Sequence, residues 1–330
     1  MVENAPARRE TELLIIGSGP TGLFAAYYAG FRGLSMVILD SLPEPGGQVT
    51  AMYPEKMIFD VPGFPAVKGQ DLVDRLIEQA GQFRPTYVLG HRAERLEHGE
   101  DSVTVTTDQG LQIVAGAVLI TAGIGTFSPK RLPAGQDYEG RGLRYFVPKL
   151  SDLAGQDVLI VGGGDSAFDW ALSLEPVARS VTLIHRRTRF RAHEHTVQRV
   201  AATRTRILTP WEVAQIFGDG QVEAVEIVNN ATQEREKLTV QAIVAALGFH
   251  ADLGPMTQWG LTQKQRHIVV DSAMRTNLPR VFAAGDIVSY DGKVKLIATG
   301  FGEAATAVNN AVPLIRPGAK VFPGHSSDAS

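Results

Sequence analysis

Two glycine-rich stretches, each placed between an apolar run and a helical pattern, constrain this chain more than any other feature. The first is LLIIGSGPTGLFAA and the second is DVLIVGGGDSAFDWA, and their first glycines stand 145 residues apart. Each stretch has the order strand, tight turn, helix. In that order the helix N-terminus presents free N–H groups and the positive end of its dipole to a pyrophosphate. The chain therefore carries two candidate dinucleotide-binding units.

The first unit has the spacing Gly-x-Gly-x-x-Gly, directly after an apolar strand. The first glycine permits the turn, the second lets the backbone approach phosphate, and the third lets the helix pack on the strand. Eighteen residues beyond the third glycine, the strand MVILD ends in Asp40. Its carboxylate is expected to accept hydrogen bonds from both ribose hydroxyls of a nucleotide without a 2′-phosphate. The expected loop contacts are Gly17, Gly19, Pro20, Thr21 and Gly22.

The second unit has alanine in the third position, and its next strand, SVTLI, ends in a histidine followed by two arginines. A carboxylate there would repel a 2′-phosphate, whereas guanidinium groups bind it through charge-assisted hydrogen bonds. The pattern favours NADPH over NADH, although HRRTRFR taken alone also fits a solvated charged face. The expected NADPH contacts are Gly162, Gly164, Asp165, Ser166, Ala167, His185, Arg186, Arg187 and Arg191.

Short apolar runs alternate with helical patterns around both units, which predicts an α/β fold. Residues 43–69, rich in proline and glycine, are expected to form a loop. The expected helices cover 20–31, 70–83, 165–175 and 300–315. The expected strands include 13–16, 36–39, 157–161, 180–184, 222–228 and one continuous strand at 237–247.

Composition excludes several functions. The net charge of −3 gives no general attraction to nucleic acid or an anionic membrane. No apolar run approaches the ~20 residues that span a bilayer, and the polar start lacks the apolar core of a signal peptide. The chain has no cysteine, which excludes disulfides and thiol redox chemistry and fits a cytoplasmic protein. No metal site is expected.

Across nearly its whole length the chain resembles the thioredoxin-reductase-like ferredoxin/flavodoxin–NADP+ reductases of bacteria. The motifs that carry the resemblance are GSGPTGLFAAYYAG, GGQVTAMYPEK, AGIGTFSPK, YFVPK, GGGDSAFDWA, HRRTRFRAH, NLPRVFAAGDI, ATGFGEAATAVNNA and VFPGHSS. The resemblance implies a thioredoxin-reductase-like architecture, with two Rossmann-like dinucleotide-binding domains of the three-layer ββα type. Residues 1–125 and 248–330 would bind FAD, with a C-terminal extension over the flavin, and residues 126–247 would bind NADPH.

The resemblance also implies individual FAD contacts. Asp40 would bind the ribose, Asp286 the ribityl hydroxyls, and Tyr53 one face of the flavin ring, although Tyr53 also fits a plain core aromatic. Tyr53 and His325, as covers of the two flavin faces, are the candidate catalytic residues. The implied FAD contacts outside the glycine loop are Asp40, Gln48, Tyr53, Ala93, Phe127, Asp286 and Ser327.

Thioredoxin reductases carry a Cys-x-x-Cys before the second glycine motif, where this chain has LRYFVPKLSDLAGQD. Without that dithiol, the flavin must pass electrons directly to an outside acceptor. The resemblance implies electron transfer between ferredoxin or flavodoxin and NADP(H) through FAD, in a homodimer. The expected hinges between domains are Gly125–Pro129 and Leu247–Ala251.

Two other functions remain open from the sequence. One is an NADPH oxidase or diaphorase that acts on oxygen or quinones. The other is a scaffold that senses NADPH and has no enzymatic activity.

Overall fold

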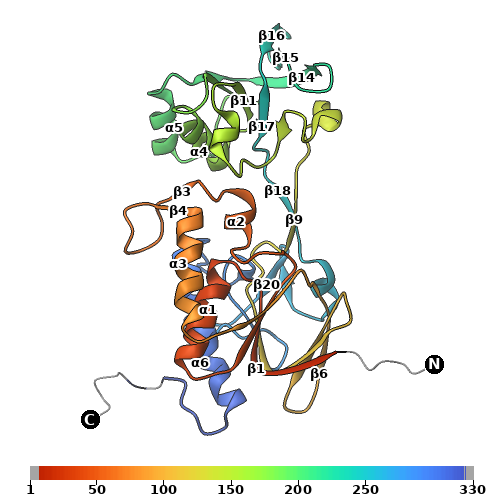
Figure 1. The fold of residues 1–330 in the computed structure, drawn as a ribbon, viewed down its shortest axis with the longest axis vertical. Coiled ribbons are helices and arrows are strands. Elements are labelled where there is room, and N and C mark those ends of the chain that lie inside the picture. Colours follow the sequence, from red (N-terminus) through yellow and green to blue (C-terminus); the bar gives the residue numbers. More distant parts are fainter. Residues whose placement is uncertain (1–6, 323, 325–330) are drawn as a thin grey trace, which may run out of the picture. The chain divides into compact units, whose positions relative to one another are not determined.

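Residues 7–322 and 324 are described by a computed structural model, so His325 and Ser327 lie outside the described residues. The chain forms two compact units. The first comprises the chain up to Ala51, Met57–Thr126 and the chain from Ala251, and the second comprises Met52–Lys56 and Phe127–His250. The crossovers are β9 (Thr126–Pro129) and β18 (Phe249–Asp252), which pair with each other (Figure 1).

The first unit is built on a seven-stranded mixed sheet in the order β5-β2-β1-β8-β7-β6, with β21 paired to the end of β8. Its centre is buried because the apolar run Leu13–Ile16 pairs in parallel with β2 on one side and β8 on the other. The strands are β1 (Arg8–Ile16), β2 (Met36–Asp40), β5 (Thr86–Leu89), β6 (Ala93–His98), β7 (Val103–Thr107), β8 (Gln112–Ile120) and β21 (Val281–Ala283).

Three helices of the first unit pack side by side against this sheet: α1 (Pro20–Phe31), α3 (Gly69–Gly81) and α6 (Ile297–Ile315) (Figure 1). Small residues let α1 approach its neighbours closely, since Ala25 and Ala29 are completely buried. The packing places the start of α1, which lies within the first glycine motif, at the carboxyl end of the parallel strands. Ligands of α/β sheets bind at that end.

The second unit has a parallel sheet in the order β10-β17-β11-β12-β13. Alternate residues of β11 face opposite layers: Val158 and Ile160 join the core under the helices, whereas Leu159 and Val161 join the core under an antiparallel sheet. The strands are β10 (Leu143–Arg144), β11 (Asp157–Val161), β12 (Ser180–Ile184), β13 (Arg206–Leu208) and β17 (Ala242–Ala245), and the helices are α4 (Asp165–Leu174) and α5 (Glu194–Ala201).

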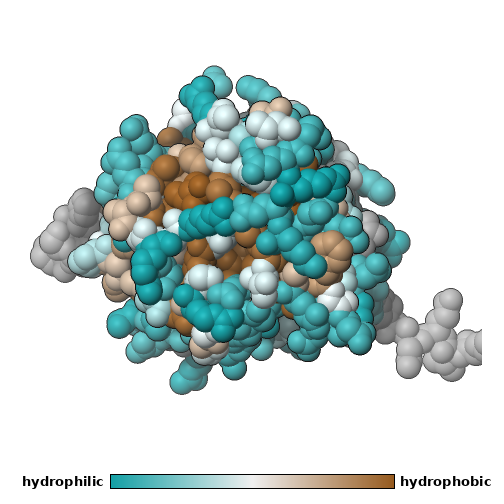
Figure 2. Space-filling model, turned by 90° about the horizontal axis from the view of Figure 1, so that it is seen from above, coloured by the Kyte–Doolittle hydropathy of each residue, from teal (hydrophilic) through white to brown (hydrophobic). Residues whose placement is uncertain are grey.

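The antiparallel layer consists of β14 (Trp211–Phe217), β15 (Ala224–Asn229) and β16 (Arg235–Thr239). Helices, parallel sheet and antiparallel sheet thus make the three layers of the predicted ββα domain. Seen from the end where β14–β16 lie, hydrophilic side chains surround and cross a smaller apolar area (Figure 2).

Two details differ from the sequence-based expectation. The predicted strand over 237–247 is wrong as one element, because β16 ends at Thr239 and β17 begins at Ala242 in another sheet. Between them the Val240 and Gln241 N–H groups bond to Glu223 and Asp157. This turn carries the chain from the antiparallel layer to the parallel one. The predicted loop over 43–69 contains α2 (Gln48–Met52), β3 (Met57–Ile58) and β4 (Val67–Lys68). The remaining strands are β19 (Gln263–Lys264), β20 (His267–Val269) and β22 (Val288–Ser289).

Candidate functional site: two dinucleotide cradles

The first glycine loop needs glycine at two of its positions for reasons of packing. Gly17 has φ +110°, and a Cβ there would lie 2.6 Å from the Thr121 carbonyl oxygen. A Cβ on Gly22 would lie 1.9 Å from the Gly17 carbonyl oxygen. The Thr121 hydroxyl donates to that same oxygen at 2.8 Å, and this hydrogen bond also holds the turn in place. Sequence reasoning identified the two glycines but missed Thr121.

The second glycine of this loop, Gly19, is not required by packing within the protein. A Cβ on Gly19 would meet nothing within 4 Å, so its side of the loop is open. Gly19 is the N-cap of α1, and no side chain caps the N–H groups of that helix. An open glycine beside an uncapped helix start is the arrangement that receives a pyrophosphate. The loop therefore fits the phosphates of a dinucleotide.

Asp40 is the last residue of β2 and lies beside this loop. Its carboxylate already accepts three hydrogen bonds from the protein. One oxygen accepts the Ser18 N–H at 2.6 Å and the Ser18 hydroxyl at 2.7 Å, and the other accepts the Leu42 N–H at 2.9 Å. A carboxylate has about four acceptor sites, so these three bonds leave about one. Binding of the ribose by Asp40 stays a prediction. The Asp40 carbonyl accepts the His91 N–H at 3.0 Å, which brings Ala93 and its strand near the cradle.

A second acidic residue, Asp286, directly follows a turn that packs on the start of α1. Gly285 has φ +85°, and a Cβ on it would lie 3.0 Å from the Thr21 hydroxyl oxygen, so the turn before Asp286 packs on the first turn of α1. Burial raises the pKa of Asp286, the cations Lys293 and Lys295 lower it, Glu303 raises it again, and His267 lowers it. The structure thus brings Thr21 and the Asp286 turn together.

Gln48 lies beside the turn that follows Thr121, since a Cβ on Gly123 would lie 2.9 Å from the Gln48 side-chain nitrogen. Its predicted contact with the flavin is not tested by this position. Pro20 is the first residue of α1, where its missing N–H costs nothing.

The second glycine loop repeats the first at the level of the backbone. The Gly162 N–H donates to the Ile184 carbonyl at 3.0 Å, as the Gly17 N–H donates to Leu39 at 2.8 Å. A Cβ on Gly162 would lie 2.5 Å from the Ala246 carbonyl oxygen, whereas one on Gly164 would meet nothing within 4 Å. Gly164 is the N-cap of α4, again without a side-chain cap.

The residues after Gly164 begin α4. Asp165 accepts the His193 N–H at 2.8 Å and so ties the following loop to the helix start. Ala167 is completely buried and Ser166 is exposed, so Ser166 alone of these two presents its side chain to solvent. Contacts of all three with NADPH stay predictions.

The basic segment at the end of β12 folds back onto the glycine loop. The Arg191 N–H donates to the Gly163 carbonyl at 2.7 Å, and a Cβ on Gly163 would lie 2.4 Å from the His185 ring. Burial lowers the pKa of His185 most, and the cations Arg186, Arg187 and Arg191 lower it further, while a backbone hydrogen bond with Arg189 raises it. Gly163, which lies between the two motif glycines in GGG, was the sequence signal for this contact.

Arg186, Arg187 and Arg191, the three arginines of this segment that were predicted to bind NADPH, have exposed side chains. Among the described carboxylates, none forms an ion pair with Arg186, Arg187 or Arg191. Three unpaired cations beside an uncapped helix start have the chemistry to bind a phosphorylated nucleotide.

Tyr53 belongs to the second unit. Its ring packs against the core around Phe168, and the Lys56 ammonium lies 5.4 Å from the ring centroid. Lys56 in turn pairs with Asp169 at 2.5 Å. The contact of Tyr53 with the flavin stays a prediction, as does that of Phe127, which lies in β9. The predicted roles of His325 and Ser327 fall outside the described residues.

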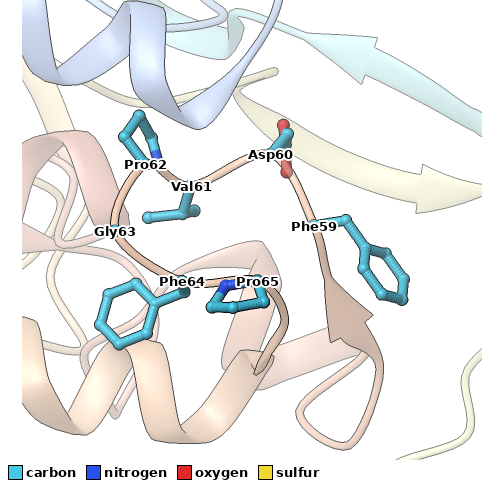
Figure 3. A pocket seen from close by; sticks show the side chains of 7 residues that line it. All are labelled: Phe59, Asp60, Val61, Pro62, Gly63, Phe64 and Pro65. Carbon is cyan, nitrogen blue, oxygen red and sulfur yellow. The ribbon is translucent and has the colours of Figure 1, made fainter.

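A separate pocket is lined by residues 59–65, between β3 and β4. Its lining includes no cradle residue. Figure 3 shows the Phe59 ring turned away from the loop and Val61 within it, in agreement with their exposed fractions of 60% and 5%.

Two cradles of this kind in one chain define a class of oxidoreductases that bind two dinucleotides. A family model described as pyridine nucleotide-disulphide oxidoreductase matches residues 11–311. The fold is similar to thioredoxin reductase of Lactococcus lactis, at 27% identity and TM-score 0.80 over 92% of this chain and 99% of that one. It is also similar to that of T. acidophilum, at 26% identity and TM-score 0.81 over 93% and 98%.

Sequence relatives narrow this class. The chain is 63% identical to a ferredoxin–NADP reductase of Frankia alni over 96% of this chain and 99% of the relative. It is 50% identical to one of Thermus thermophilus over 98% of both chains. The chain therefore belongs to the pyridine nucleotide-disulphide oxidoreductase family, among the ferredoxin–NADP reductases. Among the described helices, none is both long and apolar enough to cross a bilayer.

Proposed function

We propose that this protein transfers electrons between ferredoxin and NADP(H) through a bound FAD. The proposal depends on one observation: the two cradles have the same backbone arrangement, but the strands that follow their glycine loops lead to residues of opposite charge. The strand after the first loop ends in a carboxylate, that of Asp40, whereas the strand after the second loop is followed directly by His185, Arg186 and Arg187. The first end suits an adenosine without a 2′-phosphate, and the second suits one that carries it.

In this proposal the first unit holds FAD and the second holds NADPH. Gly19 and the start of α1 would receive the FAD pyrophosphate, Asp40 its ribose, and Asp286 its ribityl chain. When bound, FAD supplies the exchange between a one-electron carrier and a hydride acceptor. The chain's own residues bind and orient the two nucleotides, and no side chain has to supply a proton acceptor for hydride transfer.

The absence of cysteine separates this chain from relatives that reduce disulfides. With no cysteine among its 330 residues, it cannot relay electrons through a dithiol of its own. Electrons must leave directly to an external acceptor, which supports ferredoxin in that role.

Several finer points rest on the resemblance of the sequence alone. They are a homodimeric state, flavodoxin as an alternative partner, a cytoplasmic location, and covers of the flavin by Tyr53 and His325. Motion about the paired crossovers β9 and β18 belongs to the same group, because one of the flavin covers must move or the domains must rotate before nicotinamide can reach the ring.

The test is an anaerobic titration of the purified yellow protein. NADPH is expected to bleach the visible band of oxidised flavin, and oxidised ferredoxin is expected to restore it much faster than dissolved oxygen does. A colourless protein would contradict the proposal. Equal rates with ferredoxin and oxygen would favour the oxidase or diaphorase instead.

A further inference from the structure

A buried ion pair lies behind the Asp286 turn in the first unit. Glu303, in the second turn of α6, has a side chain that is 5% exposed, and its partner Lys293 is 7% exposed. One Glu303 oxygen accepts from the Lys293 ammonium and from the Tyr290 hydroxyl, the latter at 2.5 Å. Removing two charges from water is costly, so a pair this deeply buried calls for a role beyond stability.

The other oxygen of Glu303 indicates that role. It accepts the Gly285 N–H at 2.7 Å. Gly285 has φ +85° and directly precedes Asp286, so this bond fixes a left-handed turn at the base of Asp286. Hydrogen bonds from an N–H to a carboxylate are among the stronger ones in proteins. The carboxylate thus ties the Asp286 turn to α6, while Lys293 balances its charge.

The Asp286 carboxylate differs from that of Asp40. Within the described residues no hydrogen-bond donor contacts the Asp286 carboxylate, and the side chain is only partly buried. Its acceptor sites remain available, whereas three bonds to Asp40 come from the protein itself. Because no donor holds the Asp286 carboxylate itself, its orientation must be set by the backbone next to it. Preorganisation of this kind lowers the free-energy cost of binding a ligand.

From these contacts we infer that Glu303 is a positioning residue for the FAD site. Its carboxylate, balanced by Lys293 and Tyr290, holds the Gly285 N–H and so directs the Asp286 carboxylate toward the bound cofactor. The inference rests on the proposed function, because it concerns the affinity of this unit for FAD.

The test begins with Glu303→Gln. A glutamine keeps the volume, but it leaves Lys293 buried without a counterion and turns amide hydrogens toward existing donors. We expect the dissociation constant of FAD to rise about tenfold, the loss of one charge-assisted hydrogen bond. The measurement is the FAD fluorescence regained on dilution of the holoenzyme, with circular dichroism to verify the fold and the flavin spectrum as a second readout.

The double variant Glu303→Gln/Lys293→Met separates positioning from folding. Without the cation, the glutamine oxygen is free to accept the Gly285 N–H and its amide to donate to Tyr290. We expect FAD affinity to recover to within about threefold of the wild type, a residual below ~0.7 kcal/mol. Variants that change thermal stability while the FAD dissociation constant stays unchanged would overturn the inference.

Glu12 provides a matched control. Its carboxylate likewise accepts a main-chain N–H, from Ser35 at 2.7 Å, and pairs with a cation, Arg316 at 2.6 Å. Glu12 lies at the other end of α6, so Glu12→Gln is expected to leave FAD affinity unchanged. An equal loss in both variants would mean a general effect on the fold and would overturn the inference. If the wild type itself binds no FAD, the proposed function fails.

Discussion

The two cradles share one backbone design and differ in the chemistry at the end of the second strand. In both, the N–H of the first glycine donates to a carbonyl oxygen of the second strand, that of Leu39 or of Ile184. In both, the middle glycine faces open space at an uncapped helix start, Gly19 or Gly164. Recognition of the pyrophosphate is therefore built into the backbone and is common to the two units.

The side chains that follow carry the difference. Asp40 is held by three hydrogen bonds from its own unit, whereas Arg186 and Arg187 are exposed and without a described ion-pair partner. Asp40 therefore supports the fold as well as being a candidate binding group, whereas Arg186 and Arg187 remain available to a ligand. The first position should tolerate substitution less well in the absence of ligand than the second.

The largest effects are expected from filling the open side of each loop. Gly19→Val should weaken FAD binding by up to about a hundredfold, because the valine occupies the space for phosphate and steric overlap of this kind costs up to about 3 kcal/mol. Gly164→Val should raise the KM for NADPH similarly and leave FAD content unchanged. Isothermal titration with each nucleotide separates the two, and loss of both ligands in either variant would contradict independent cradles.

A matched control separates a substitution that blocks the ligand from one that disturbs packing within the protein. Gly22→Ala places a Cβ against the Gly17 carbonyl, where the distance would be 1.9 Å. This variant is expected to lower the free energy of unfolding of the FAD-free chain, which Gly19→Val is not. Denaturant titration without nucleotide is the measurement.

The next largest effect is expected from removing the arginines that follow β12. Arg186→Ala and Arg187→Ala are each expected to raise the KM for NADPH about tenfold, since a hydrogen bond to a charged group contributes about 1.5–3 kcal/mol before solvent screening. The KM for NADH should change little. Steady-state kinetics with a small dye acceptor measure both, and an equal rise for the two nucleotides would refute 2′-phosphate recognition.

The cradles were predictable from sequence because each depends on local order. Glycine spacing, a flanking apolar strand and the residue eighteen positions later lie within one strand–turn–helix–strand segment. The three-layer fold followed from the resemblance. The split between β16 and β17 did not, because an apolar run does not reveal where a chain changes sheets.

Contacts between distant segments escaped the sequence analysis. Thr121 contacts Gly17 from the end of a neighbouring strand, and Glu303 contacts Gly285 from a helix, so neither contact could be derived from the local sequence around it. A signal for Glu303 did exist: it falls at helical spacing among Gly300, Ala304 and Ala307, on the buried face of α6. A charge on an apolar stripe is the pattern that predicts a paired, buried group.

A smaller effect compares the two acidic residues of the first unit. Asp40→Asn should lower the unfolding free energy of the FAD-free chain by about 1–3 kcal/mol, because the amide nitrogen cannot accept the bonds made to one of the two carboxylate oxygens. Asp286→Asn should raise it at neutral pH. Burial raises the pKa of Asp286 from 3.8, so its ionisation costs stability as pH rises through the folded-state pKa. The gain should vanish below pH 3.8, which denaturant titrations at several pH values would reveal.

The smallest effect concerns His185 at the basic end. Burial and the neighbouring arginines hold its pKa below 6.5. The unfolded chain therefore binds this proton more readily, and the stability that His185 contributes is complete above pH 6.5 and is lost as pH falls through the folded-state pKa. His185→Asn should flatten this acid-side loss in denaturant titrations. NADP+ should lessen the loss in the wild type more than NAD+ does, because a 2′-phosphate offsets the arginine charges. Identical effects of the two nucleotides would place the phosphate away from this cluster.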